Sequence, residues 1–230
     1  MNVLVACEES QRVCTAFRER GHNAFSCDIL PCSGGHPEWH IQGDVLEILE
    51  PTPYEDCAVD PINFETMDGK THIINGRWDL IIAHPPCTFL TNTGNRWFDV
   101  TKYGMAAQKR WHERCEAIVF FLRLASASCS KIVIENPIGC MSTLYRKPDQ
   151  IIHPYMFGDP ERKATCLWLK GVPELKPTNL VKPNVITYKN GKGTDSPWHM
   201  NTMSLPKEER AKERSKTFPG IAKAMAEQWG

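Results

Sequence analysis

Residues 78–90 read WDLIIAHPPCTFL, and this stretch decides the fold. Its apolar run from Leu80 to Ala83 is short and continuous, which is typical of a strand buried on both faces of a parallel sheet. The run stops at His84, and two prolines with fixed φ angles then precede Cys87. Parallel sheets bind their ligands at the carboxyl ends of their strands. We therefore expect Cys87 to lie at a functional site rather than in the core.

Strand-like and helix-like segments alternate on both sides of this stretch. Short apolar runs predict strands, and apolar residues at helical spacing predict helices. The predicted strands are NVLVAC (2–7), HNAFSCDIL (22–30), INGRWDLIIAHPPC (74–87), KIVIENP (131–137) and KATCLWLKG (163–171). The predicted helices are QRVCTAFRERG (11–21), residues 104–126 and FPGIAKAMAEQWG (218–230). This alternation predicts one α/β domain over residues 1–230, with a doubly wound, mostly parallel sheet.

The chain changes character after residue 148, where prolines interrupt nearly every segment. Residues 188–216 are polar and rich in turn formers, and their second half alternates basic and acidic residues. This composition predicts a mobile loop that leads into the start of a charged helix.

The charge balance and the cysteines limit the function classes. Lysine plus arginine and aspartate plus glutamate both number 27, so the chain lacks the global positive field of nonspecific nucleic-acid binders. A DNA-binding function would need a local patch. Ten cysteines without a spacing framework, and a strand-like start, predict neither a disulfide scaffold nor a secretory signal. No segment approaches the roughly 18 apolar residues of a membrane span. We expect a soluble, cytoplasmic protein with no membrane partner.

Glu135 occupies the same kind of position as Cys87. It ends the apolar run of KIVIENP and is followed by Asn136 and Pro137. A carboxylate at the end of a buried strand is costly unless it is paired or faces a cleft. A thiolate can add to an electron-poor carbon while a neighbouring carboxyl group holds a proton on the ring under attack. Cys87 and Glu135, which follow the two apolar runs, are therefore the predicted nucleophile and acid.

These residues resemble the motifs of a known family. PPC (85–87) and ENP (135–137) resemble the Pro-Cys and Glu-Asn-Val motifs of the cytosine-C5 DNA methyltransferases, and they occur in the family's order. The sequence of residues 6–45 is also similar to that of small phage-type DNA methylases. The resemblance implies a Rossmann-like S-adenosylmethionine-dependent methyltransferase fold and a DNA partner. It also implies that Cys87 attacks carbon 6 of a flipped cytosine while Glu135 stabilises the protonated ring nitrogen.

The resemblance also implies a cofactor site. The family's glycine-rich first turn is replaced here by ACEESQ (6–11), so polar side chains would make the contacts. Asp28 resembles the acidic residue that binds the cofactor ribose, and GDV (43–45) resembles the family's adenine contact. The closing helix at residues 218–229 resembles the one that lines the cofactor pocket. The implied cofactor-binding residues are Glu8, Glu9, Ser10, Gln11, Asp28, Ile29, Asp44, Val45 and Pro85.

The DNA contacts implied by the resemblance follow the nucleophile and the later motif. TFLTNTGNR (88–96) resembles the family's mobile catalytic loop, whose DNA contacts would come from Asn92, Gly94, Asn95 and Arg96. FGDPERKATCLWL (157–169) resembles an arginine-rich motif in which Glu161, Lys163 and Thr165 replace glutamine and two arginines. Arg162, Lys163 and Asn136 complete the implied substrate and DNA residues.

The recognition region is short. Only residues 170–215 separate the arginine-rich motif from the closing helix, which predicts short or relaxed sequence selectivity. So small a region is compatible with a homodimer or with an accessory recognition subunit.

Several alternatives stay open. HPPC shares its prolines with exocyclic-amine methyltransferases that act on cytosine N4 or adenine N6, but it lacks their aromatic residue. The missing glycines and altered arginine motif are compatible with a DNA-binding pseudoenzyme, and the cofactor could be a modified S-adenosylmethionine that delivers a larger group. His84 could tune Cys87 or fill a turn. A cluster with tolerable zinc spacing is formed by Cys27, Cys32, His36 and His40, although we expect no metal there.

Overall fold

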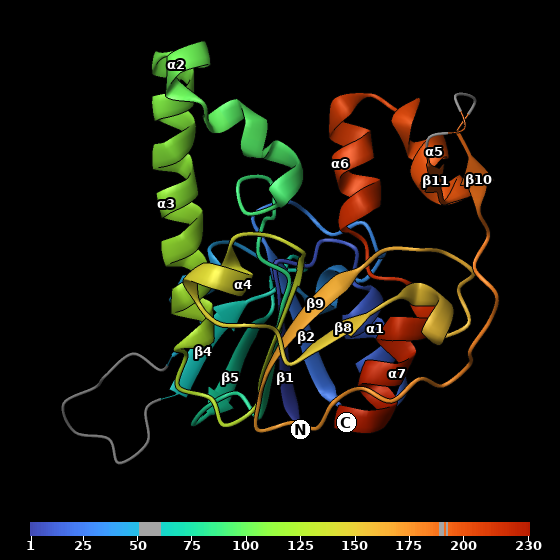
Figure 1. The fold of residues 1–230 in the computed structure, drawn as a ribbon. Coiled ribbons are helices and arrows are strands. Elements are labelled where there is room, and N and C mark those ends of the chain that lie inside the picture. Colours follow the sequence, from blue (N-terminus) through green and yellow to red (C-terminus); the bar gives the residue numbers. More distant parts are fainter. Residues whose placement is uncertain (51–60, 189–190, 192) are drawn as a thin grey trace.

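A computed structural model describes residues 1–50, 61–188, 191 and 193–230. Its centre is a seven-stranded sheet with the order β3-β2-β1-β6-β7-β9-β8 (Figure 1). The first five strands of that order are parallel, and β9 runs antiparallel to both β7 and β8. The strands are β1 (Asn2–Ala6), β2 (Asn23–Asp28), β3 (His40–Gln42), β6 (Leu80–Ala83), β7 (Ile132–Pro137), β8 (Gln150–Ile152) and β9 (Thr165–Lys170). The mixed α/β fold with a mostly parallel sheet is compatible with the predicted Rossmann-like type.

Helices cover both faces of the sheet. The α-helices are α1 (Arg12–Glu19), α2 (Val100–Tyr103), α3 (Met105–Ala125), α4 (Met141–Leu144), α5 (Pro197–Met203), α6 (Lys207–Ser215) and α7 (Pro219–Trp229). Short 3-10 helices are η1 (Pro37–Trp39), η2 (Val45–Glu47), η3 (Asn92–Phe98) and η4 (Pro154–Met156). Two hairpins stand apart from the sheet: β4 (Pro61–Glu65) with β5 (Thr71–Asn75), and β10 (Ile186–Thr187) with β11 (Thr194–Asp195).

The apolar strands supply two cores because successive side chains point to opposite faces. Val3 and Val5 of β1 pack with α1 and α7, whereas Leu4 and Ala6 face α3, α4 and the β4–β5 hairpin. All four of these side chains are fully buried. Continuous apolar strands are therefore required here, as the sequence predicts for strands covered on both faces.

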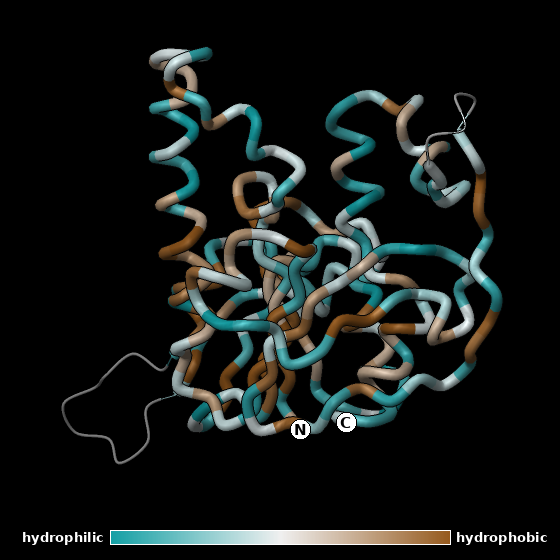
Figure 2. Tube along the Cα trace, viewed as in Figure 1, coloured by the Kyte–Doolittle hydropathy of each residue, from teal (hydrophilic) through white to brown (hydrophobic). Residues whose placement is uncertain are grey.

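Two arms rise above the carboxyl ends of the parallel strands (Figure 1). The left arm consists of η3, α2 and the start of α3, and the right arm consists of β10, β11, α5 and α6. Both arms are largely hydrophilic, whereas hydrophobic residues concentrate in the sheet below them (Figure 2). The carboxyl edge of the sheet is thus flanked by polar structure on two sides.

The structure corrects parts of the sequence prediction. Residues 74–75 end strand β5 of the β4–β5 hairpin, and the central strand starts only at Leu80. Residues 188–216, predicted as a loop before a helix start, contain β11, α5 and α6, although 189–190 and 192 lie outside the described residues. Strand β8 was not predicted. In the part of the chain that the structure describes, no helix has the length and apolarity needed to cross a bilayer.

Candidate active site at the carboxyl edge of the sheet

The strand order reverses direction at β1, which lies between β2 and β6. Open α/β sheets bind ligands in the crevice at such a switch point. The two loops that leave this point begin with Cys7 after β1 and His84 after β6. They are tied together where the His84 backbone N–H donates to the Ala6 carbonyl at 2.9 Å. Both sequence motifs, ACEESQ and HPPC, therefore start at the edge where a ligand is expected.

Cys87 lies in the loop after β6, next to the strand that carries Glu135. Strands β6 and β7 are paired, and the last pair is Ala83 opposite Ile134. Glu135 is the next residue of β7 after this pair. The Asn136 side chain donates to the Pro85 carbonyl at 2.7 Å, which ties the proline loop to β7. Asn136 is only 2% exposed, so its side-chain amide holds the proline loop and does not face an open surface.

The Cys87 thiol is half-buried, and its environment favours the neutral form. Burial raises its pKa above the ordinary value of 9.0, and the negative charge of Glu135 raises it further. The charge of Lys163 opposes both effects. Lys163 precedes β9 and donates from Nζ to the Arg214 carbonyl in α6 at 3.0 Å. The cation that lowers the pKa of Cys87 is therefore held between the sheet and the right arm.

Glu135 forms a buried ion pair with His84. Their Oε2 and Nδ1 atoms lie 2.7 Å apart, and the side chains are 10% and 8% exposed. Burial would raise the pKa of Glu135, but the hydrogen bond from His84 and the charge of Lys163 lower it overall. Burial would lower the pKa of His84, but Glu135 raises it overall. His84 is thus a partner of the candidate acid rather than a simple turn residue.

The loop after β1 contains two buried carboxylates. Glu8 accepts from the Val13 and Cys14 backbone N–H groups at 2.6 and 3.1 Å, which satisfies the start of α1. Burial raises the pKa of Glu8 to about 7. Glu9 is 6% exposed, and neither of its carboxylate oxygens has a hydrogen-bond partner among the described residues. The nearest cation is Lys212 of α6, with Nζ 3.7 Å from Oε2.

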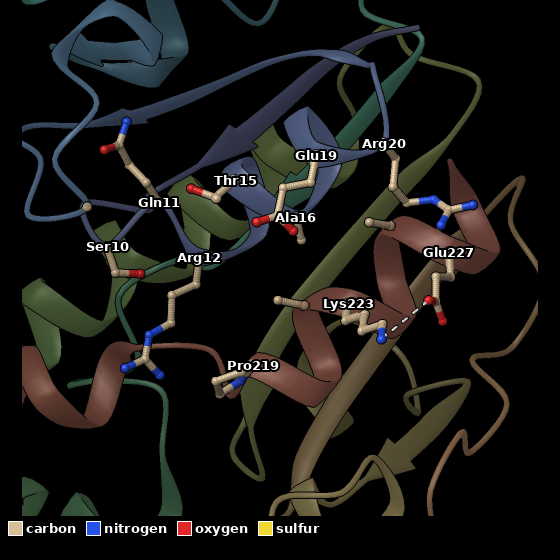
Figure 3. A pocket seen from close by; sticks show the side chains of 13 residues that line it. Ser10, Gln11, Arg12, Thr15, Ala16, Glu19, Arg20, Pro219, Lys223 and Glu227 are labelled. Carbon is tan, nitrogen blue, oxygen red and sulfur yellow. Dashed lines mark ion pairs between the residues drawn. The ribbon is translucent and has the colours of Figure 1, made fainter.

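Ser10 and Gln11 turn away from this edge. The Gln11 amide donates to the His36 carbonyl at 2.8 Å and accepts from the His36 N–H at 3.0 Å. Both residues line a groove of about 710 Å³ between α1 and α7 (Figure 3). Polar contacts with a ligand at the sheet edge would therefore come from Glu9 rather than from the Gln11 side chain.

Acidic residues lie at or just after the ends of the next two strands. Asp28 closes β2, and burial raises its pKa, while one of its oxygens accepts from the Leu30 N–H at 2.9 Å. Asp44 follows β3, is exposed and caps η2 through the Leu46 N–H at 2.9 Å. Ile29 is 74% exposed, whereas Val45 is a core side chain at 4%. Two of the predicted cofactor contacts, Asp28 and Asp44, thus lie at successive strand ends.

The predicted catalytic loop is anchored by two arginines that the sequence analysis did not identify. Arg114 of α3 donates from Nε to the Phe89 carbonyl and from Nη2 to Asn95 Oδ1, both at 2.7 Å. Arg110 donates to the Thr88 carbonyl at 3.3 Å, and its guanidinium would lie 2.8 Å from a Cβ on Gly94. Their spacing of four residues on one helix is the only sequence signal that could have indicated them.

The remaining predicted DNA residues are exposed. Asn92 and Arg96 project from η3, and the Arg96 guanidinium lies 4.7 Å from the centre of the Trp97 ring. Arg162 lies beside Thr194 of the right arm, at 3.4 Å. These side chains therefore come from the left arm and from the segment before β9 that lies against the right arm.

The four residues with tolerable zinc spacing do not converge. His40 uses both ring nitrogens, one with Ser26 Oγ at 2.8 Å and one with the Leu30 carbonyl at 2.9 Å. His36 stacks on Trp39 with ring centres 3.8 Å apart. Within the described residues, no three side chains of the metal-binding types gather at one point.

Comparison with known proteins adds no assignment. No protein-family model matches the chain, and no curated protein matches it.

Proposed function

We propose that this protein is an S-adenosylmethionine-dependent DNA methyltransferase that modifies carbon 5 of a flipped cytosine through a covalent bond to Cys87. The observation that carries the proposal is the pairing of β6 with β7, because it puts a thiol and a carboxyl group on adjacent strand ends. The charge of Glu135 raises the pKa of the Cys87 thiol, as expected for a thiol and a carboxylate in this arrangement. The sheet order, in which an antiparallel β9 separates β7 from β8, is consistent with the methyltransferase type that the sequence predicts.

The residues at the switch point fit the proposed cofactor. Glu9 offers two buried carboxylate oxygens without a hydrogen-bond partner, which suit the amino group of a methionine moiety. Asp28 ends β2 and Asp44 follows β3, and both could accept hydrogen bonds from ribose hydroxyls or from the base. When bound, S-adenosylmethionine supplies an electrophilic methyl group for carbon 5.

The protein's own residues would carry the steps on the base. A target cytosine must leave the helical stack to reach a thiol in the loop after β6. The Cys87 thiol gives its proton to water, helped by the charge of Lys163, and its sulfur forms a bond to carbon 6. Glu135 holds the ring nitrogen in its protonated form, which accepts the electrons of the attack. Once carbon 5 carries the methyl group, the carbon-5 proton passes to water, its electron pair forms the carbon 5–carbon 6 double bond, and the sulfur–carbon bond breaks to regenerate the thiolate.

The two arms would hold the DNA. Asn92 and Arg96 on the left arm, and Arg162 beside the right arm, offer donors to phosphates. Because the whole chain has no net charge, such local groups have to supply the attraction.

The proposal is tested by mass spectrometry of nucleosides from DNA incubated with the protein and S-adenosylmethionine. We expect 5-methylcytosine with the wild type and with Cys115→Ser, a matched control at an exposed cysteine of α3. We expect none with Cys87→Ser. Formation of N4-methylcytosine or N6-methyladenine, or an active Cys87→Ser variant, would refute the thiol mechanism and favour amine methylation.

A further inference from the structure

The His84–Glu135 pair poses a problem of proton balance for the proposed reaction. Ring nitrogen 3 of cytosine is an acceptor, so a group that stabilises its protonated form must bring a proton. A carboxylate only accepts hydrogen bonds, whereas a carboxylic acid donates one. Because its pKa is lowered, Glu135 carries no proton of its own near neutral pH. The proton therefore has to come from a neighbour.

We propose that His84 is a positioning residue that stores the proton which Glu135 presents to the ring nitrogen of the bound base. This inference rests on the proposed function. Its basis is the direct contact between His84 Nδ1 and Glu135 Oε2, at 2.7 Å, in a setting where both side chains are about nine-tenths buried. At this distance the proton passes between the two residues without a carrier.

The other ring nitrogen of His84 has no described partner. Nε2 is buried and makes no hydrogen bond among the described residues, whereas Nδ1 contacts Glu135. Nδ1 is therefore the position from which the ring can pass a proton to a described side chain. The His84 backbone is fixed by its bond to Ala6, and Pro85 is fixed by Asn136, so the ring cannot easily swing away.

Charged groups from two further segments face the pair. Glu8, in the loop after β1, raises the pKa of His84, and Lys163, before β9, lowers it. Lys163 also lowers the pKa of Glu135. Cys87, in the same loop as His84, has its pKa raised by the charge of Glu135. Together these groups favour one proton on the pair, held by His84 until the base arrives.

The transfer is balanced. The Nδ1–H bond of His84 breaks and leaves its electron pair on Nδ1, while an O–H bond forms on Glu135. The imidazolium becomes neutral and the carboxylate becomes a carboxylic acid, so the total charge of the pair is unchanged. A half-turn of the carboxyl group about its Cγ–Cδ bond turns the O–H toward the base. When the product leaves, the proton returns to His84.

The test compares wild type with His84→Asn over a range from about pH 5.5 to about pH 8. Asparagine can still donate a hydrogen bond to Glu135, but it cannot store a proton. His112→Asn is the matched control, because His112 is an exposed histidine of α3 with 77% of its side chain accessible. The readout is the ratio of kcat/KM for cytosine methylation, wild type over variant. Alkylation of Cys87 measured over the same range separates any change in thiolate content.

We expect the ratio to rise by up to about tenfold per pH unit and to reach about 100-fold near pH 8, because the variant must protonate Glu135 from solvent. The His112→Asn ratio stays near one. A flat ratio for His84→Asn in a variant that still folds, with a wild type that methylates cytosine, would overturn the proton store alone. A wild type that forms no modified cytosine at any pH would refute the proposed function and the proton store together.

A second readout does not depend on activity. Titration of the His84 ring by NMR should give a pKa above 6.5 in the wild type, and Glu135→Gln should lower it. An identical His84 titration in both proteins would contradict the proposal, because the proton would then not be held for Glu135.

Discussion

Replacing Arg114 with methionine should release the predicted catalytic loop from α3. Arg114 is 6% exposed, makes two hydrogen bonds of 2.7 Å to residues 89 and 95, and places its guanidinium 3.5 Å from the centre of the Phe98 ring. Each hydrogen bond from a charged group contributes about 1.5–3 kcal/mol, and the contact with the ring about 1–2 kcal/mol. Because these contributions overlap and methionine retains some packing, we expect a loss of about 3–5 kcal/mol.

The assay is urea unfolding combined with hydrogen exchange. With a slope of about 3 kcal/mol per molar for a chain of this size, the unfolding midpoint should fall by about 1–2 M. Amide protection in residues 88–98 should fall as well. Arg123→Met on the exposed side of the same helix is the control and should change stability by less than about 0.5 kcal/mol. If Arg114→Met matches this control in both midpoint and loop protection, Arg114 does not anchor the loop.

Three further predictions concern the same edge of the sheet. Iodoacetamide should modify Cys87 more slowly than the exposed Cys115 at about pH 8, because burial raises the Cys87 pKa, and peptide mapping that finds the reverse order would contradict this. Glu8 has a folded pKa of about 7 against an ordinary 4.5, so the folded state binds more protons and wild type should lose stability as pH rises between these values. Glu8→Gln should lack this loss in urea titrations, and parallel pH curves for the two proteins would refute the assignment. In Gly139→Ala the new Cβ would clash with the Leu90 carbonyl group, so the melting temperature should fall sharply, whereas Gly43→Ala, with nothing within 4 Å, should melt close to wild type.

The sequence predicts the centre of the fold because buried parallel strands have a simple pattern. Leu80 to Ala83 and Ile132 to Ile134 are continuous apolar runs, and each is followed by a residue of the candidate site. Since strands joined by a helix commonly pair in parallel, the closeness of Cys87 and Glu135 follows from their order along the chain. The reversal at β1 also follows from a doubly wound sheet.

Contacts between side chains far apart in sequence could not be predicted. His84 meets Glu135 across 51 residues, and no local pattern selects that partner over Cys87. Arg110 and Arg114 read as ordinary charged residues on a surface helix, yet they bind loop carbonyls. Helix α5 was missed because turn-forming residues surround it, although Ser196 caps it by accepting from the His199 N–H at 3.2 Å.

The central claim is that Cys87 bonds to a cytosine, and a trapped adduct tests it most directly. In DNA containing 5-fluorocytosine at the target position, carbon 5 carries fluorine instead of the proton that must leave, so the sulfur–carbon bond should persist. After incubation with S-adenosylmethionine, intact-mass analysis should detect the protein with the oligonucleotide attached, and peptide mapping should place the bond at Cys87. Absence of the adduct on DNA that the protein methylates, or an adduct that survives in Cys87→Ser, would contradict the mechanism.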